Sequence, residues 1–222
     1  MIKAIFYDMG DIFFEAHFWR KWMFDKLVSL NKFNGSFSDF YFYYESFLLP
    51  VYEGIKEYNT AYFDFLDSLK IKEKESFFRE SFKIKKQFEN NRILFPEVKS
   101  TLKELNSLGI INVVITDNEQ SEKDIRRNIL ERFNINEFID TVFSSKSYNL
   151  TKPNPKIFEL AMNKFSLSSS DVFFVGHDKE EIDGAEAIGI RSVEFNNYLG
   201  LPTSATFKID HFSELINLTL NE

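Results

Sequence analysis

The chain has no cysteine, and this absence removes several kinds of site at once. Disulfides, thiolate zinc sites and cysteine nucleophiles are all excluded. Histidine is also scarce, with 3 residues in the chain, and these are not arranged in pairs. Any metal ion must therefore be held by oxygen or imidazole ligands.

Long apolar runs are missing too. No window approaches the roughly 18 uncharged apolar residues of a membrane span, and Met1 leads directly into a strand-like segment without a signal-peptide pattern. We therefore expect a cytoplasmic location and no membrane partner. The net charge of −7 argues against nucleic-acid binding, which ordinarily requires an excess of positive charge.

Phenylalanine, by contrast, is abundant. The chain holds 27 of them in 222 residues, many between positions 13 and 95. Aromatic side chains bury a large area with few rotors to freeze, so we expect a Phe-rich helical core, with an aromatic ligand site as the alternative. A chain of this length can bury one full core and carry a modest inserted subdomain.

Short apolar runs alternate with helical patterns over most of the chain. Six runs are typical of buried strands: 2–7, 110–115, 141–143, 171–175, 191–195 and 206–209. Strands that alternate with helices imply right-handed crossovers and a parallel sheet covered on both faces. We therefore predict a Rossmann-like α/β fold with three layers, α/β/α.

Residues 17–92 interrupt this alternation, because they contain helical patterns and no strand signal. Phe18, Trp22, Leu27 and Leu30 are spaced as one apolar helix face, and Pro50 is expected to end the second helix. The segment lies between the first and second strands. We therefore predict an inserted helical cap at 17–92 and a core domain formed by 1–16 and 93–222.

The first strand ends at a carboxylate, Asp8, with Gly10 and Asp11 directly behind it. Ligands of open α/β sheets bind beyond the carboxyl ends of the strands, so Asp8 stands where a catalytic group would stand. A turn residue or a helix N-cap is the structural alternative for such an Asp.

Three more polar clusters follow later strands. They are Thr116-Asp117-Asn118, Lys152-Pro153-Asn154-Pro155, and Gly176-His177-Asp178 with Glu180 and Glu181 behind. In order, spacing and strand context, the four clusters together resemble the haloacid dehalogenase (HAD) superfamily, and the resemblance covers essentially the whole chain. It implies the predicted α/β core with a helical cap between the first and second clusters.

The resemblance also implies a role for each matching position. Asp8 matches the nucleophile that becomes an aspartyl-phosphate. Thr116 matches the hydroxyl that binds a phosphoryl oxygen, and Lys152 the ammonium that offsets the negative charge. Asp117 and Asn118 are assigned to substrate binding. The implied cofactor is Mg²⁺, held by Asp8, the carbonyl of Gly10 and acids of the fourth cluster.

Two positions depart from the commonest pattern of the family. Where most relatives have a second Asp, the general acid and base, this chain has Gly10, and Asp11 one position later is the candidate replacement. Where the metal-binding acid is usual, it has His177. We expect Asp178, with Glu181 acting through water, to complete the metal shell, and His177 remains the alternative.

Two functions are compatible with these residues. The first is a Mg²⁺-dependent phosphatase of a small phosphomonoester, and the second is a catalytically weak protein that binds a phosphorylated ligand or a protein partner. Dehalogenases of the superfamily carry an aromatic residue at the position of Gly10, which disfavours halide chemistry. Arg20 is the candidate from the cap for a second anionic group of the substrate. No feature of the sequence fixes the oligomeric state.

Overall fold

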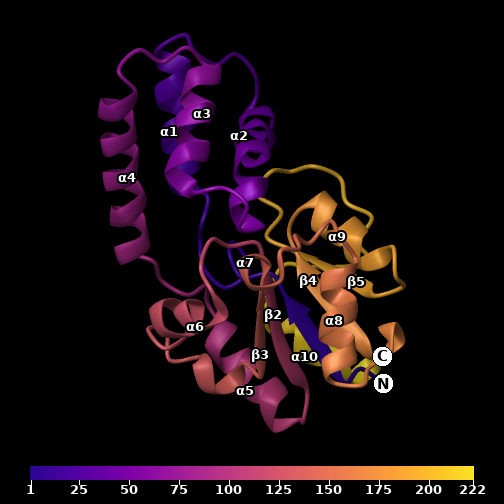
Figure 1. Ribbon diagram of the computed structural model, residues 1–222. Coiled ribbons are helices and arrows are strands. Elements are labelled where there is room, and N and C mark those ends of the chain that lie inside the picture. Colours follow the sequence, from indigo (N-terminus) through magenta and orange to yellow (C-terminus); the bar gives the residue numbers. More distant parts are fainter.

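The computed structural model describes residues 1–222 and contains a six-stranded sheet in which all neighbours are parallel (Figure 1). The strands are β1 (Ala4–Tyr7), β2 (Ile111–Thr116), β3 (Thr141–Ser144), β4 (Val172–Gly176), β5 (Arg191–Phe195) and β6 (Phe207–Ile209). They lie in the order β3-β2-β1-β4-β5-β6. Successive strands are added on one side of β1 as far as β3, and on its other side from β4 onward. The carboxyl ends of β1 and β4 therefore border the crevice where doubly wound folds bind ligands.

Helices cover both faces of this sheet, as the alternating side chains of its strands require. Tyr7 and Val114 belong to one buried cluster together with residues of α5 and α10, and Phe6 and Phe174 belong to a second with residues of α8 and α9. The helices of this part are α5 (Val98–Ser107), α6 (Glu122–Ile125), α7 (Ser145–Tyr148), α8 (Lys156–Lys164), α9 (Lys179–Glu186) and α10 (Glu214–Asn221), with single turns at η1 (Arg126–Leu130), η2 (Asn136–Phe138) and η3 (Ser169–Asp171). The predicted three-layer α/β/α core is confirmed.

Four helices between β1 and α5 form a unit that we call the helical lobe: α1 (Phe18–Ser29), α2 (Phe37–Tyr52), α3 (Tyr58–Ser68) and α4 (Lys74–Asn90). They stand together at the top of Figure 1. Their buried aromatic and aliphatic residues make a cluster separate from those on the sheet. Tyr44 and Phe65 meet edge to face at 4.9 Å, as aromatic pairs prefer. The expected Phe-rich core lies here, and the boundaries of an independent cap at 17–92 stay a prediction.

Two details of the helical lobe differ from the expectation. The buried face of α1 consists of Trp19, Met23 and Leu27, whereas Phe18 is 44% exposed and Leu30 46%. The face is thus turned by one residue, toward Tyr44 on α2. Helix α2 also continues through Pro50 to Tyr52, because Pro50 lies in its last turn, where burial of Val51 and Tyr52 outweighs the lost backbone hydrogen bond.

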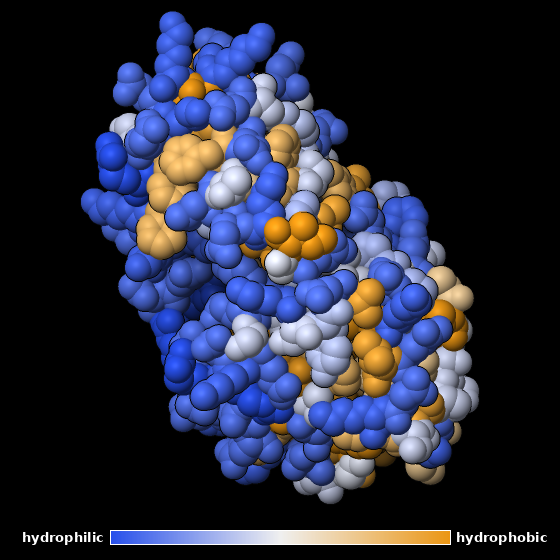
Figure 2. Space-filling model, viewed as in Figure 1, coloured by the Kyte–Doolittle hydropathy of each residue, from blue (hydrophilic) through white to orange (hydrophobic).

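Hydrophilic side chains predominate on the face shown in Figure 2, over both the helical lobe and the sheet domain, with apolar atoms in separate patches. None of the helices combines the length and the apolar character needed to cross a membrane. Most aromatic residues of the helical lobe belong to its buried cluster or pack against it.

Candidate active site

Asp8 follows β1 directly and is held by the neighbouring strand. Its backbone N–H donates to Val175 O of β4 at 2.9 Å, and the residue is 5% exposed. The chain then turns back sharply, with Asp11 at φ 59° and its N–H donating to Phe14 O at 2.8 Å. Asn196 Nδ2 fixes the turn by donating to Asp11 O at 2.7 Å. The turn therefore holds the Asp8 carboxylate at the end of the strand, inside the protein.

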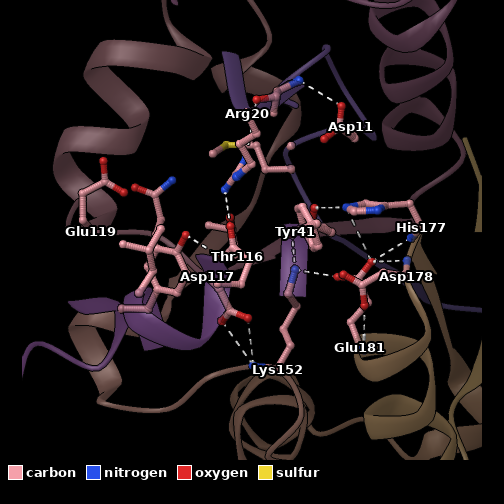
Figure 3. Close-up of a pocket in the computed structure, with 18 of the residues that line it drawn as sticks. Asp11, Arg20, Tyr41, Thr116, Asp117, Glu119, Lys152, His177, Asp178 and Glu181 are labelled. Carbon is pink, nitrogen blue, oxygen red and sulfur yellow. Dashed lines mark hydrogen bonds and ion pairs between the residues drawn. The ribbon is translucent and has the colours of Figure 1, made fainter. Parts of the chain in front are cut away.

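Lys152 lies between two buried carboxylates. Its Nζ donates to Asp8 Oδ1 and forms an ion pair with Glu181 Oε2 at 2.6 Å. Its backbone N–H donates to Asp117, at 3.1 and 3.2 Å from the two carboxylate oxygens (Figure 3). One residue thus joins the loop after β2, the end of β1 and helix α9.

His177 supplies a second cation beside Asp8. Its Nε2 lies 3.6 Å from Asp8 Oδ2 and 3.9 Å from Glu181 Oε1. Burial alone would lower the pKa of His177, but the charges of Glu181, Asp178 and Asp8 raise it to about 10, so the imidazole is protonated at neutral pH. Burial would also raise the pKa of Asp8, yet Lys152 and His177 hold it below its ordinary value. Asp8 is therefore an ionised carboxylate, the form that a nucleophile needs.

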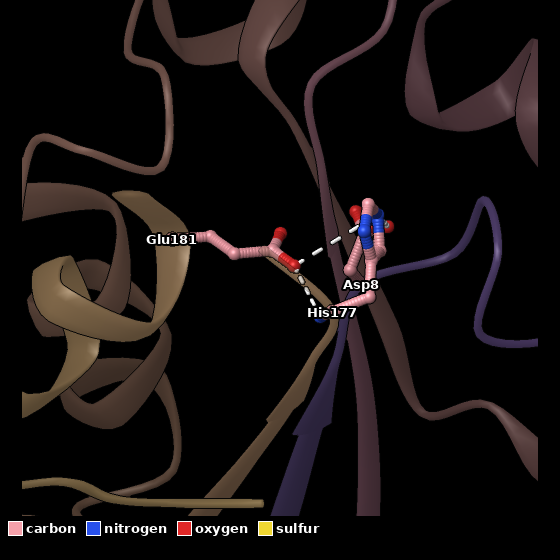
Figure 4. Close-up of side chains that lie close together, drawn as sticks. All are labelled: Asp8, His177 and Glu181. Carbon is pink, nitrogen blue, oxygen red and sulfur yellow. Dashed lines mark hydrogen bonds and ion pairs between the residues drawn. The ribbon is translucent and has the colours of Figure 1, made fainter. Parts of the chain in front are cut away.

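Asp8, His177 and Glu181 form a buried group that could hold a metal ion, since one ligand atom from each lies within 4.8 Å of the others (Figure 4). The two carboxylates fit Mg²⁺, which prefers oxygen, whereas the imidazole, protonated without a metal, would bind a transition ion only after losing that proton. Glu181 Oε1 accepts hydrogen bonds from His177 N at 2.7 Å and Asp178 N at 3.2 Å, which orients the carboxylate. The donor set fits a divalent cation.

Asp178, the acid that we expected to complete the metal shell, has a structural role as well. Its Oδ1 accepts from Glu181 N at 3.2 Å, as the N-cap of α9. Burial, followed by the charge of Glu181, raises the pKa of Asp178 to about 7. The three-residue group contains His177 in place of Asp178, and metal binding by Asp178 and by the Gly10 carbonyl stays a prediction.

Asp11, the candidate replacement for the missing acid, is tied to its own loop. Its Oδ1 accepts from Ala16 N at 2.9 Å and lies 2.7 Å from His17 Nδ1. The His17 ring stacks on Tyr198 at 3.9 Å, and Tyr198 also lies near His177, at 5.3 Å between ring centroids. The Asp11 carboxylate is thus held by contacts with the residues that lead into α1.

The residues after β2 occupy the other side of the site. Thr116 is 3% exposed at the end of the strand. Burial raises the pKa of Asp117 to about 7, since the attraction of Lys152 is offset by the charges of Asp8 and Glu181. The side chain of Asn118 accepts from Gln120 N at 2.9 Å and stabilises its own loop.

All the residues that the sequence predicted to be catalytic, substrate-binding or metal-binding line one cavity of about 180 Å³. The helical lobe contributes part of the wall, so the cavity lies between the lobe and the carboxyl ends of the strands. Arg20 of α1 is in this wall (Figure 3), where its Nη2 pairs with Glu45 Oε1 at 2.7 Å. Glu45 in turn accepts from the Tyr52 hydroxyl at 2.9 Å. The charge of Arg20 is therefore already matched within the lobe.

Sequence reasoning missed other residues of the cavity wall, among them Tyr41, Lys85, Arg92 and Glu119. Lys85 of α4 pairs with Glu119, in the loop after β2, at 3.3 Å. Arg92 stands where the chain returns from the helical lobe to the sheet. This position could have marked Arg92 as a candidate in the sequence. An insertion that covers a site must return to the core near that site, so the residues at its end lie close to the cavity.

A family model described as "Haloacid dehalogenase-like hydrolase" matches residues 41–195, more than half of the chain. The chain belongs to the haloacid dehalogenase-like hydrolases. Among curated members of known name, it is 32% identical over 104 residues to ribulose-1,5-bisphosphate 5-phosphatase of Halopiger xanaduensis, which covers 46% of this chain and 42% of that protein. It is 25% identical over 131 residues to (S)-2-haloacid dehalogenase 1 of Pseudomonas sp. strain CBS-3, covering 57% and 56%.

The haloacid dehalogenase-like fold extends over the whole chain. A solved structure of a predicted phosphoglycolate phosphatase from Haemophilus somnus 129PT matches with a TM-score of 0.67 at 19% identity, covering 98% of both chains. By sequence, the chain spans only about half the length of the curated relatives it matches. The relatives include phosphatases and dehalogenases. Membership of the family therefore indicates a hydrolase, but it does not identify the bond that is cleaved.

Proposed function

We propose that the protein is a metal-dependent phosphatase that hydrolyses a small phosphomonoester through an aspartyl-phosphate on Asp8. One observation carries this proposal: an ionised, buried carboxylate contacts an ammonium group and lies beside a set of metal ligands, at the floor of a cavity. A cavity of about 180 Å³ is small beside the roughly 300–1,000 Å³ of sites for drug-sized ligands. The phosphatase among the relatives supports the same reaction class.

In the proposed first step, Asp8 attacks phosphorus, a P–O bond forms to its carboxylate, and the bond to the leaving alkoxide breaks. Lys152 stabilises negative charge on the transferred group, and Thr116 donates to one phosphoryl oxygen. Asp8, Glu181, the Gly10 carbonyl and Asp178 would hold a divalent ion, which would neutralise charge at the phosphoryl oxygens. Water then attacks phosphorus while Asp11, as general base, takes its proton; the bond between phosphorus and Asp8 breaks, phosphate is released and the Asp8 carboxylate is restored.

The leaving alkoxide needs a proton, and Asp11 is the proposed donor. It lines the cavity, and the carboxylate that remains after it donates takes a proton from the water of the second step. Asn118 and Asp117 would contact the substrate on the opposite side of Asp8. The helical lobe would act as the cap that excludes bulk water during the reaction.

A second function, binding without turnover, is favoured by the same Asp11 contacts. A carboxylate engaged by Ala16 N and His17 is less free to serve a substrate, and Gly10 offers no acid of its own. Such a protein would hold a phosphorylated ligand or a partner and release it unchanged.

The deciding experiment measures turnover of p-nitrophenyl phosphate and a panel of phosphorylated metabolites with Mg²⁺ or Mn²⁺, using the wild type, Asp8→Asn and Lys152→Ala. We expect metal-dependent turnover by the wild type and losses of at least about 100-fold in both variants. 2-Chloropropionate in the panel tests halide release. Wild type as inert as Asp8→Asn on every phosphate ester would overturn the phosphatase proposal and favour the binding protein.

A further inference from the structure

Arg92 is a half-buried cation without a full set of partners. Its side chain is 17% exposed, and its Nε has no hydrogen-bond partner. The one carboxylate within ion-pair distance is Glu89, whose Oε1 lies 3.8 Å from Nη2. A guanidinium carries five N–H donors in a planar fork, so one with a buried, unpartnered Nε and a single distant anion is unusual.

The backbone places Arg92 beside the reaction centre. The loop after Asp8 turns back so that Phe14 forms a bridge with Gly10, and Phe14 forms a second bridge with Leu94. The Arg92 guanidinium lies over the Phe14 ring, 4.8 Å from its centroid. Arg92 therefore lines the same cavity as Asp8.

The electrostatics leave Arg92 short of negative charge. Burial lowers the pKa of Arg92, and the attraction of Glu89 is partly cancelled by repulsion from Arg20. Arg20, by contrast, has Glu45 at 2.7 Å and lies between the rings of Trp19 and Tyr41. The two arginines share the cavity wall, but only one of them has a close counter-ion.

We propose that Arg92, rather than Arg20, binds a second anionic group of the substrate, a carboxylate or another phosphate. This inference rests on the proposed function and narrows its substrate to phosphomonoesters that carry another acid a few bonds away. A carboxylate placed in the plane of the guanidinium would accept two parallel hydrogen bonds from its N–H groups. Because this group stays outside the reacting bond, Arg92 is a specificity residue and not a catalytic one.

Binding of three phosphonates tests the proposal without any turnover, since their C–P bonds are not hydrolysed by phosphoryl transfer. Methylphosphonate has one anionic group, and phosphonoacetate and 3-phosphonopropionate add a carboxylate at two distances. Calorimetry with Mg²⁺ present gives each affinity for the wild type, Arg92→Gln and Arg92→Lys. Arg191→Gln is the matched control, because Arg191 pairs with Glu222 and does not line the cavity.

We expect at least one carboxylated phosphonate to bind the wild type and Arg191→Gln about 10- to 100-fold more tightly than methylphosphonate does. In Arg92→Gln this advantage should vanish, with methylphosphonate binding unchanged within about twofold. Arg92→Lys keeps the charge but lacks the fork, so it should retain part of the advantage. If circular dichroism shows that Arg92→Gln is unfolded, Arg92→Lys decides alone: a preference for the carboxylated phosphonates as large as that of the wild type overturns the proposal.

The remaining outcomes separate two failures. Equal wild-type affinity for all three phosphonates, or an advantage that survives in Arg92→Gln, overturns the role of Arg92 and leaves the phosphoryl site intact. Absence of wild-type binding to every phosphonate overturns the phosphoryl site itself, and the proposed function with it.

Discussion

Four side chains make a nearly neutral cluster at the end of β1. Asp8 and Glu181 are the anions, and Lys152 and His177 the cations. Removing one member of such a cluster leaves an uncompensated buried charge, which costs more than the intact pair contributes. The effect of any single substitution here should therefore be measured on stability as well as on metal binding or turnover.

His177 is the member whose replacement should change the metal preference. His177→Asp replaces an imidazole, which must lose its proton to bind a metal, with an anionic oxygen donor, in a cluster that already has Asp8 and Glu181. We expect Mg²⁺ affinity to rise by at least about tenfold relative to Mn²⁺. Calorimetric titration of each ion into wild type and variant measures the ratio. His177→Gln is the control without the new anion, and an unchanged Mg²⁺/Mn²⁺ ratio in His177→Asp would show that position 177 does not bind the ion.

Asp117 should make stability depend on pH. Its pKa is raised from 3.8 to about 7 in the folded protein. Between these values the unfolded chain has lost the proton and the folded protein keeps it, so the free energy of unfolding falls as pH rises from about 4 to about 7. The loss is fully present above pH 7.

Asp117→Asn removes this ionisation while keeping an acceptor for Lys152 N. We expect the variant and the wild type to melt alike near pH 4, and the variant to be more stable at pH 8 by at least roughly 2–4 °C, the shift that about 1 kcal/mol produces in a chain of this size. Thermal melts in chelator at both pH values measure the difference. A variant less stable than wild type at pH 8 would mean that Asp117 is ionised and stabilising there.

At this scale the sequence was most informative about residues that follow strands. Asp8, Thr116 and Lys152 line the same cavity because parallel topology brings strand ends to one edge. Arg92 was missed because its position depends on the bridges of Phe14, and the Asp11–His17 contact because it depends on the positive φ of Asp11. Contacts of this kind arise from loop packing, which has no periodicity to read.

Helix α9 is the element that positions the acidic part of the site. Its first turn presents Asp178 and Glu181, and its middle packs directly on the Lys152 backbone. A Cβ on Gly184 would lie 2.5 Å from Lys152 O, closer than such contacts occur, so this glycine permits the approach. The sequence predicted this helix, but nothing in its pattern marked Gly184 as the contact point.

Gly184→Ala tests whether α9 holds Lys152 in place. Alanine is the better helix former, so propensity alone predicts a gain of stability. The clash with rigid backbone should instead cost about 1–3 kcal/mol and move Lys152 relative to Asp8. We expect kcat/KM to fall at least about tenfold, measured on the best phosphate ester. Lys179→Ala, on the exposed face of the same helix, is the control, and a Gly184→Ala protein with wild-type stability and activity would contradict the role given to this contact.

Helix boundaries show what local patterns can and cannot predict. The turned face of α1 and the continuation of α2 through Pro50 both result from burial against other helices of the lobe. Burial of large aromatic side chains contributes more than one lost backbone hydrogen bond. Local propensity therefore located the helices, while packing within the lobe set their faces and ends.

On the scale of the whole molecule, the helical lobe and the sheet domain meet across the cavity, and few charged contacts join them. The Lys85–Glu119 pair is one: Lys85 is 13% exposed, and its ammonium lies over the Tyr58 ring at 4.5 Å. Burial would lower the pKa of Lys85, yet Glu119 keeps it above its ordinary value. A lysine in this position needs its carboxylate, because water reaches it poorly.

A double-mutant cycle on this pair tests whether it couples the two parts. Glu119→Gln should lower the free energy of unfolding by about 1–3 kcal/mol, because it leaves Lys85 unpaired. Lys85→Met keeps the contact with Tyr58, so the double variant should regain more than half of that loss. Urea melts provide the values, and the exposed Lys26–Glu80 pair within the lobe is the control, with an expected coupling of about 0–1 kcal/mol. If both pairs couple equally weakly, Lys85–Glu119 is an ordinary surface contact, and the lobe is held to the sheet domain by its other contacts and by the two chain connections.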